Sequence, residues 1–340
     1  MSRSDAMPAA VDRPDAGPNP EPIADRRRPD RAEPGPAAAP AEERGLSVWS
    51  RLKFELVRTF LALWTRLFSL SGLYWLGQTF GTCEYLLDYH RRRRVHRRLA
   101  RIFPEGLSAS RRRLFTWRYF RRVRCDKLIY LIMDKVPREK LLRRTKWHGR
   151  EHLDAALARG KGAYIMLAHY GSHHVAGPIM ALLGYRVAGV RDPKEAPIRR
   201  YVQQKYAEVF PEIKAVRVYF ADTFPRQFYR EFAENGVLCS ALDIDRFRGE
   251  HLKTCPVTVF GQTHEWLTGT LQIALRCGAT VMQGFVVSRR NYYFRWELSA
   301  PLIDPDAGRD EPELVARVMQ QYASNIESHA RHHPDHLMKI

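Results

Sequence analysis

The chain has 340 residues, of which 45% are hydrophobic, and it carries a formal net charge of +19. This length supports one large domain or two ordinary ones, and the hydrophobic content excludes a wholly disordered chain. The basic excess favours an anionic partner, which is nucleic acid, anionic lipid or an acidic protein. Five scattered cysteines without a C-x-x-C pair indicate reduced thiols and no zinc site.

Residues 1–45 predict a disordered tail. They contain nine prolines, seven arginines and nine acidic residues, and almost no large apolar side chains. Such a segment buries too little apolar surface to offset the entropy lost on ordering. The basic excess therefore belongs to the rest of the chain.

Residues 46–145 predict a helical region close to a membrane. Residues 46–89 are rich in Leu, Phe, Trp and Tyr, and the 21 residues 67–87 include one charged side chain, Glu84. That length suits a membrane span, but Gly72, Gly77 and Gly81 dilute its hydrophobicity. Three interpretations stay open: a single spanning anchor, a helix lying in the membrane interface, and a buried helical hairpin.

A strongly basic run follows this apolar segment. Residues 91–124 contain 14 arginines and one acid, Glu105, with Trp117, Tyr119 and Phe120 interleaved. Basic residues beside an aromatic apolar segment suit an anionic bilayer surface. Arginine and aromatic residues also bind nucleic acid, but no nucleic-acid motif accompanies them, so we expect no nucleic-acid partner.

Residues 146–340 predict an α/β domain. Short apolar runs alternate with amphipathic helical stretches, which favours a largely parallel central sheet with helices on both faces. The predicted strands are residues 163–168, 186–190, 216–220, 237–242, 279–287 and 292–298. The predicted helices are residues 175–183, 198–210, 224–233, 267–276 and 313–330.

His169 is the first candidate for catalysis. It lies at the carboxyl end of the predicted strand 163–168, just before a predicted helix. Ligands of open α/β sheets bind at the carboxyl ends of the strands. The helix N-terminus nearby disfavours a protonated imidazole, so the position suits a general base.

Several segments, in order, resemble the lipid A biosynthesis lauroyl/myristoyl acyltransferases, a family within the lysophospholipid acyltransferase superfamily. The similar segments are residues 91–94, 102–104, 160–171, 189–193, 242–245, 257–261, 268–270, 278–281 and 333–335. The resemblance covers about residues 46–338. It implies acyl transfer from an acyl-carrier thioester to a hydroxyl or amine of a lipid, without a cofactor, on the cytoplasmic face of the inner membrane.

In that family a histidine and a carboxylate five positions later form the catalytic pair. The resemblance makes His169 the base, but position 174 is His174 and not a carboxylate. A neutral His174 can orient His169 without supplying a negative charge. Alternatively, Asp243 or Asp245 takes over the role of the acid. The resemblance further implies substrate binding by Gly171, Arg191, Asp243 and Asp245.

Two other functions stay open. The first is a non-catalytic lipid-binding relative that keeps the fold and the basic surface. The second is a metal-dependent enzyme that uses His169, His173 and His174, whose spacing suits metal ligation. For the acyltransferase, the expected partners are an acyl donor (acyl carrier protein or coenzyme A thioester), a lipid acceptor and an anionic membrane surface.

Overall fold

The computed structural model describes residues 47–192, 195–220, 225–244, 252–306 and 310–338. The predicted disordered tail, residues 1–45, lies outside this range and stays a prediction. Residues 44–340 form one compact unit.

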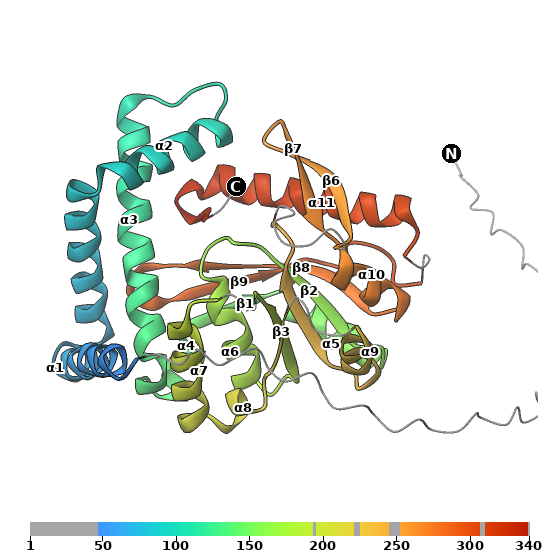
Figure 1. Ribbon diagram of the computed structural model, residues 1–340, viewed down its shortest axis with the longest axis horizontal. Helices are drawn as coiled ribbons and strands as arrows, with labels where there is room; N and C mark the ends of the chain where they lie inside the picture. The colour runs from blue at the N-terminus through green and yellow to red at the C-terminus, as the bar shows by residue number, and fades with distance from the viewer. Residues whose placement is uncertain (1–46, 193–194, 221–224, 245–251, 307–309, 339–340) are drawn as a thin grey trace, which may run out of the picture. The chain divides into compact units, whose positions relative to one another are not determined.

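Helices fill the described chain up to the first strand. They are α1 (Val48–Leu87), α2 (Tyr89–Ile102), α3 (Ala109–Ile132) and α4 (Arg138–Arg143), with a 3₁₀ turn, η1 (Met133–Lys135), after α3. Ser69, with a φ of 61°, divides α1 into two segments, because an L residue at positive φ leaves the right-handed helical region. The second segment runs beside α3 (Figure 1).

Two glycines allow this close approach of α1 to α3. A Cβ atom at Gly81 would lie 2.5 Å from the Cα atom of Arg121, and one at Gly77 would lie 2.8 Å from Cys125 Sγ. The glycines that dilute the hydrophobicity of residues 67–87 therefore serve helix packing. The second segment of α1 fits the helical-hairpin interpretation.

Seven strands form the central sheet in the order β1-β9-β8-β2-β5-β3-β4. They are β1 (Thr145–His148), β2 (Ala163–Leu167), β3 (Val187–Arg191), β4 (Arg217–Phe220), β5 (Val237–Ala241), β8 (Thr280–Ser288) and β9 (Phe294–Leu298). Neighbouring strands from β8 to β4 run parallel, whereas β9 is antiparallel to β8 and parallel to β1. The predicted α/β class with a largely parallel sheet is confirmed.

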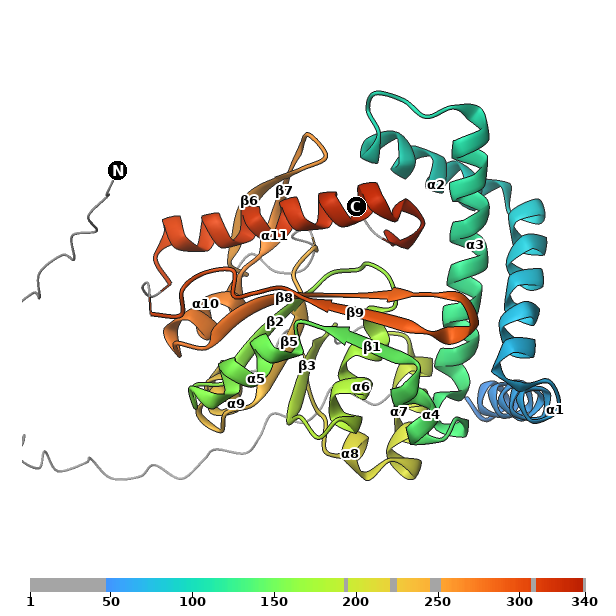
Figure 2. The same cartoon turned by 180° about the vertical axis from the view of Figure 1, so that it is seen from behind.

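Helices cover both faces of this sheet (Figures 1 and 2). Alternate side chains of β2 enter opposite cores: Ile165 joins one cluster of buried residues, and Tyr164 and Met166 join the other. The Ile165 side is covered by α4, α5 (Arg150–Ala158), α6 (Ala176–Leu182), α7 (Pro197–Val209) and α8 (Pro211–Lys214). The Tyr164 side is covered by α9 (Arg226–Ala233), α10 (Gly269–Arg276) and α11 (Pro312–His332).

Several elements were missing from the sequence prediction, among them the helices α5 and α8. Strand β1 adds to the sheet edge beside β9, and β6 (Thr254–Val259) pairs with β7 (Gln262–Leu267) in a separate antiparallel hairpin. β1 and β7 are short and largely polar, so their sequences give a weak strand signal. β6 does alternate buried and exposed residues, and the prediction missed it nevertheless. The remaining predicted strands and helices are confirmed to within a few residues at each end.

The first segment of α1 exposes an apolar stripe. Trp49, Leu52, Leu56, Phe60, Leu63 and Leu67 recur at intervals of three or four residues, and each side chain is about half exposed or more. Residues at this spacing lie on one face of a helix. No helix in the described ranges combines the length and the hydrophobicity that a membrane span requires.

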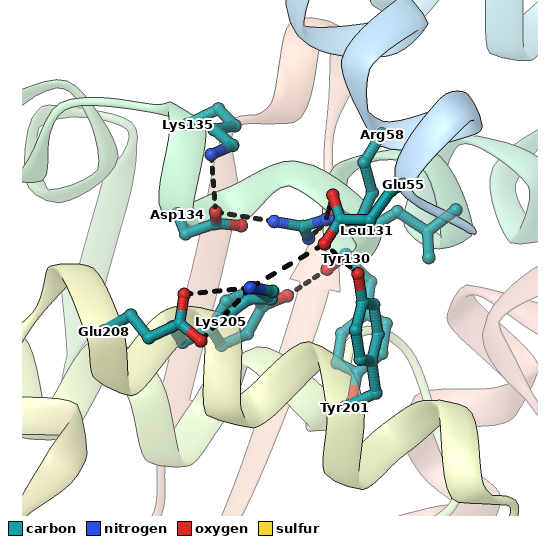
Figure 3. A network of polar contacts seen from close by, with 10 residues as sticks. Glu55, Arg58, Tyr130, Leu131, Asp134, Lys135, Tyr201, Lys205 and Glu208 are labelled. Atoms are coloured by element: carbon teal, nitrogen blue, oxygen red, sulfur yellow. Dashed lines mark hydrogen bonds and ion pairs between the residues drawn. The ribbon is translucent and has the colours of Figure 1, made fainter. Parts of the chain in front are cut away.

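A polar network attaches this segment to the rest of the protein (Figure 3). Arg58, only 1% exposed, pairs with the buried Asp134 at 2.8 Å and donates to the Leu131 carbonyl. Nearby, Tyr201 of α7 donates to Glu55, and Lys205 lies 3.7 Å from the same carboxylate. Because Arg58 and Asp134 neutralise each other away from water, losing one partner leaves an uncompensated buried charge.

We predict that Asp134→Asn destabilises the protein by about 3–5 kcal/mol. The substitution keeps the shape of the side chain but removes the buried counter-charge of the Arg58 guanidinium, which then has only the half-exposed Glu55 at 3.8 Å. Lys205→Gln, which removes a partly exposed charge from the same network, should cost no more than about 1 kcal/mol. Denaturant unfolding of both variants checks this, and equal losses would contradict the role assigned to the buried pair.

Candidate active site

Three adjacent parallel strands end at one edge of the sheet. In the sheet β5 lies between β2 and β3. His169 follows the end of β2, Asp243 follows the end of β5, and Arg191 is the last residue of β3. This edge, at the carboxyl ends of the strands, is where open α/β sheets bind ligands.

The carboxylate of Asp243 holds His169 with both of its oxygens. The main-chain N–H of His169 donates to Asp243 Oδ2 at 2.7 Å, and the ring Nδ1 lies 2.9 Å from Oδ1. The Asp243 side chain is 5% exposed and that of His169 is 18% exposed. The two residues are 74 positions apart, so the pairing of β2 with β5 brings them together.

Tyr322 of α11 fixes the carboxylate side of this pair. Its hydroxyl donates to the Leu167 carbonyl at 2.6 Å, lies 3.4 Å from Asp243 Oδ1, and accepts from the main-chain N–H of Leu242. Tyr322 is fully buried. The sequence analysis did not identify this residue, because it lies in an amphipathic helix, where a buried aromatic usually serves only the core.

The pairing dictates which ring nitrogen of His169 is available for chemistry. An ionised carboxylate can only accept a hydrogen bond, so Nδ1 carries the hydrogen and Nε2 has the free lone pair. The Met338 N–H also donates to the His169 carbonyl at 2.9 Å, which holds the main chain. A histidine oriented in this way is suited to act as a general base.

His174, predicted to be catalytic, packs against Tyr130 and does not contact Nδ1 of His169. It falls in the 3₁₀ turn η2 (His173–Val175), and its ring meets Tyr130 edge-on with centroids 5.1 Å apart. Within the described residues no hydrogen bond joins His174 to His169, whose Nδ1 pairs with Asp243. Burial lowers the pKa of His174 to about 4, although the charge and main chain of Asp126 oppose the shift. His174 is therefore neutral at neutral pH and places no positive charge near His169.

Gly171 acts through its main chain. Its φ is +58°, its N–H donates to the His336 carbonyl at 2.8 Å, and a Cβ atom there would lie 2.0 Å from the Val286 carbonyl oxygen. Only glycine tolerates both the conformation and the contact. Because the N–H is already bonded within the protein, the geometry gives Gly171 a role in shaping the loop after His169 and offers no donor for the predicted substrate binding.

Arg191 and Asp245 complete the set of predicted substrate-binding residues. Arg191 bonds to Glu195 at 3.1 Å, and its side chain is 22% exposed. A partly exposed guanidinium at a strand end can still meet an anionic group. Asp245 lies outside the described residues, so its predicted role stays a prediction.

The histidine-rich segments do not form a metal site. The described residues contain no group of three or more His, Cys, Asp or Glu side chains placed to hold a metal ion. The His169 and His173 rings are 5.4 Å apart, and those of His173 and His174 are 5.9 Å apart, both edge-on. The described side chains therefore give no support to the metal-dependent alternative, which stays a prediction.

A family model described as bacterial lipid A biosynthesis acyltransferase matches residues 50–335. The match covers the N-terminal helices, the sheet and α11. A search of curated proteins finds no match to the chain.

The lowered pKa of His174 predicts a pH-dependent stability. The unfolded chain binds a proton at this residue below its ordinary pKa of 6.5, whereas the folded protein resists protonation down to about pH 4. Above pH 6.5 His174 is neutral in both states and does not lower the free energy of unfolding. As the pH falls towards 4, this free energy decreases by up to about 3 kcal/mol, because the unfolded chain binds the proton first. In His174→Gln, unfolding free energies measured between pH 4 and 7 should show a shallower decline, and an unchanged slope would refute this explanation.

Proposed function

Because the chain belongs to the bacterial lipid A biosynthesis acyltransferase family, we propose that it moves a fatty acyl group from a carrier thioester to a hydroxyl or amine of a membrane lipid. His169 is the general base and Asp243 is the carboxylate that orients it. The observation that carries this proposal is the two-point contact between His169 and Asp243 at the carboxyl edge of the sheet.

The reaction uses the free lone pair on Nε2 of His169. Nε2 takes the proton of the acceptor hydroxyl as the oxygen attacks the thioester carbonyl carbon, and the carbonyl electrons move onto oxygen. When the tetrahedral intermediate collapses, the carbon–sulfur bond breaks and the leaving thiolate takes the proton back from Nε2. Asp243 stays ionised and stabilises the imidazolium between these steps.

Asp243 supplies the negative charge that position 174 lacks. A carboxylate needs only to reach Nδ1, and its place along the chain does not matter. The side chain of Asp243 does so from the neighbouring strand end, with a second bond to the main chain of the same histidine. Arg191, at the end of the next strand, supplies the positive charge that stabilises the developing oxyanion.

The basic face of α2 is the proposed docking surface for the acyl donor. His90, Arg93, Arg94 and Arg97 line a cavity of about 600 Å³. This set offers three positive charges to an acidic carrier protein, and opposite charges speed and orient encounter. Coenzyme A, which also carries phosphates, is the other donor that this surface can accept.

The apolar stripe on the first segment of α1 is the proposed membrane contact. Its six large apolar side chains face outward, while Arg58 of the same segment pairs inward with Asp134. A helix with these two faces can lie along a bilayer surface with its apolar side down. The proposed location is the cytoplasmic face of the inner membrane, where a carrier thioester and a lipid acceptor can meet.

We predict that Asp243→Asn lowers the turnover of acyl transfer by about 10²- to 10⁴-fold, because an amide favours the wrong tautomer of His169. His169→Ala should abolish transfer, and His174→Gln should keep activity within about tenfold of the wild type. The readout is the lipid profile of cells that lack the protein and carry each variant in turn.

Two outcomes of this experiment would contradict the proposal. If His174→Gln abolishes the acylated lipid and Asp243→Asn does not, the proposed pair is wrong. If His169→Ala restores the profile in full, the protein acts without this base, and a non-catalytic lipid-binding role replaces the proposal.

We also predict that Leu56→Glu combined with Leu67→Glu weakens membrane binding by at least about tenfold, since each buried leucine contributes about 1.5–3 kcal/mol. Vesicles of phosphatidylethanolamine and phosphatidylglycerol, sedimented with the protein, provide the measurement. Val209→Glu changes an equally apolar side chain that is 47% exposed on α7 and serves as the control. Equal sedimentation of the double variant and the wild type would exclude the stripe as the contact.

A further inference from the structure

A second cavity, of about 410 Å³, lies beside the loop that follows His169. Its walls come from four segments far apart in the chain: the second segment of α1, the middle of α3, the turn from β8 into η3 (Arg290–Tyr292), and η4 (Pro334–His336). The volume falls in the range of small-molecule sites. The cavity is therefore large enough to hold a charged group together with part of the molecule attached to it.

Arginines dominate the lining of this cavity. They are Arg118, Arg121, Arg122, Arg289 and Arg290, against two acidic residues, Asp126 and Asp335. Within the described residues, Arg122 is the only one of the five with a carboxylate partner, Asp126 Oδ2 at 2.6 Å. Burial opposes ionisation of Asp335, but the neighbouring His336 and the charge of Arg122 lower its pKa to about 2. A net positive charge therefore faces the cavity.

Two of the lining arginines carry buried polar atoms without partners. The side chain of Arg122 is 7% exposed, and its Nη2 has no hydrogen-bond acceptor in the described structure. The same holds for Nε of Arg121. Donors left unpaired in this way are costly, and a ligand with several acceptor oxygens would satisfy them.

Aromatic side chains hold two of the arginines in place. The Arg121 guanidinium lies 4.0 Å from the ring centre of Trp117, and that of Arg290 lies 5.5 Å from the ring centre of Trp75. Cation–π contacts of this kind order a guanidinium without neutralising its charge. The planar forks stay available for a tetrahedral oxyanion, which arginine binds with several parallel hydrogen bonds.

The cavity shares a wall with the candidate active site. His336 lines the cavity with its side chain, while its main-chain carbonyl accepts the Gly171 N–H at 2.8 Å. The next residues continue the contact, because Leu337 bridges Tyr170 and the Met338 N–H bonds to the His169 carbonyl. A molecule held in the cavity is thus next to the loop that carries the proposed base.

We propose that this cavity binds the phosphate group of a substrate. Two sources share this chemistry: the phosphate headgroup of the acceptor lipid, and the phosphopantetheine phosphate of the acyl donor. The assignment to a substrate rests on the acyl transfer proposed above, whereas the capacity to bind phosphate does not.

The test measures binding of three probes to the full chain by titration calorimetry: inorganic phosphate, 4′-phosphopantetheine, and dihexanoyl phosphatidic acid. Arg121→Gln combined with Arg289→Gln should weaken phosphate binding by at least about tenfold, because two charge-assisted donors are lost. Arg122 is left intact, since its pairing with Asp126 is structural. Arg317→Gln, an exposed arginine of α11 outside the cavity, is the matched control and should bind as the wild type does.

The outcomes separate the two sources and the two proposals. Tighter binding of phosphatidic acid than of inorganic phosphate assigns the cavity to the acceptor, and tighter binding of phosphopantetheine assigns it to the donor. His169→Ala should bind every probe normally, so phosphate binding stands even if acyl transfer fails. Binding of inorganic phosphate alone would mean an adventitious ion only and would overturn the inference, as would equal binding by the double variant and the wild type.

Discussion

The contact between Asp243 and His169 is the constraint on which the candidate site depends. One carboxylate accepts from the main chain and the ring of the same histidine, so it fixes the position of the loop and the tautomer together. The contact exists because β2 and β5 are parallel neighbours and their carboxyl ends lie side by side. Tyr322 bonds to both strand ends and ties this arrangement to the long C-terminal helix.

Under the proposed mechanism, this contact lets a member of the family carry a histidine at position 174. The orienting carboxylate needs a short distance to Nδ1 and a buried setting, and Asp243 has both. Residue 174 is then free to pack, and His174 packs against Tyr130 in an environment that keeps it neutral. A charged histidine there would instead oppose the imidazolium of the proposed mechanism.

The two segments of α1 are attached to the rest of the protein by different contacts. The first segment of α1 is fixed by the buried charge pair of Arg58 and Asp134, which leaves its apolar stripe facing outward. The second segment packs on α3 through Gly77 and Gly81, and the two helices contribute one side of the arginine-lined cavity.

The sequence by itself determined the α/β class, most element positions and the candidate base. Alternation of apolar runs with amphipathic stretches is a local property, and it placed β2 and β5 within a residue or two of their observed ends. The position of His169 after a buried strand followed from the same pattern. Local spacing also identified the apolar and arginine-rich segments at the N-terminus.

Only the tertiary structure decided which residues meet. Asp243 was one of two acids predicted as alternatives to the missing carboxylate, and the pairing of β2 with β5 brings it to His169. Sequence separation carries no information about such neighbours across a sheet. The arginine-lined cavity likewise combines segments more than 200 positions apart in the chain. In the sequence, the glycines of α1 only reduced the hydrophobicity of a predicted span. In the structure they leave room for α3, which lies too close for a Cβ atom at Gly77 or Gly81.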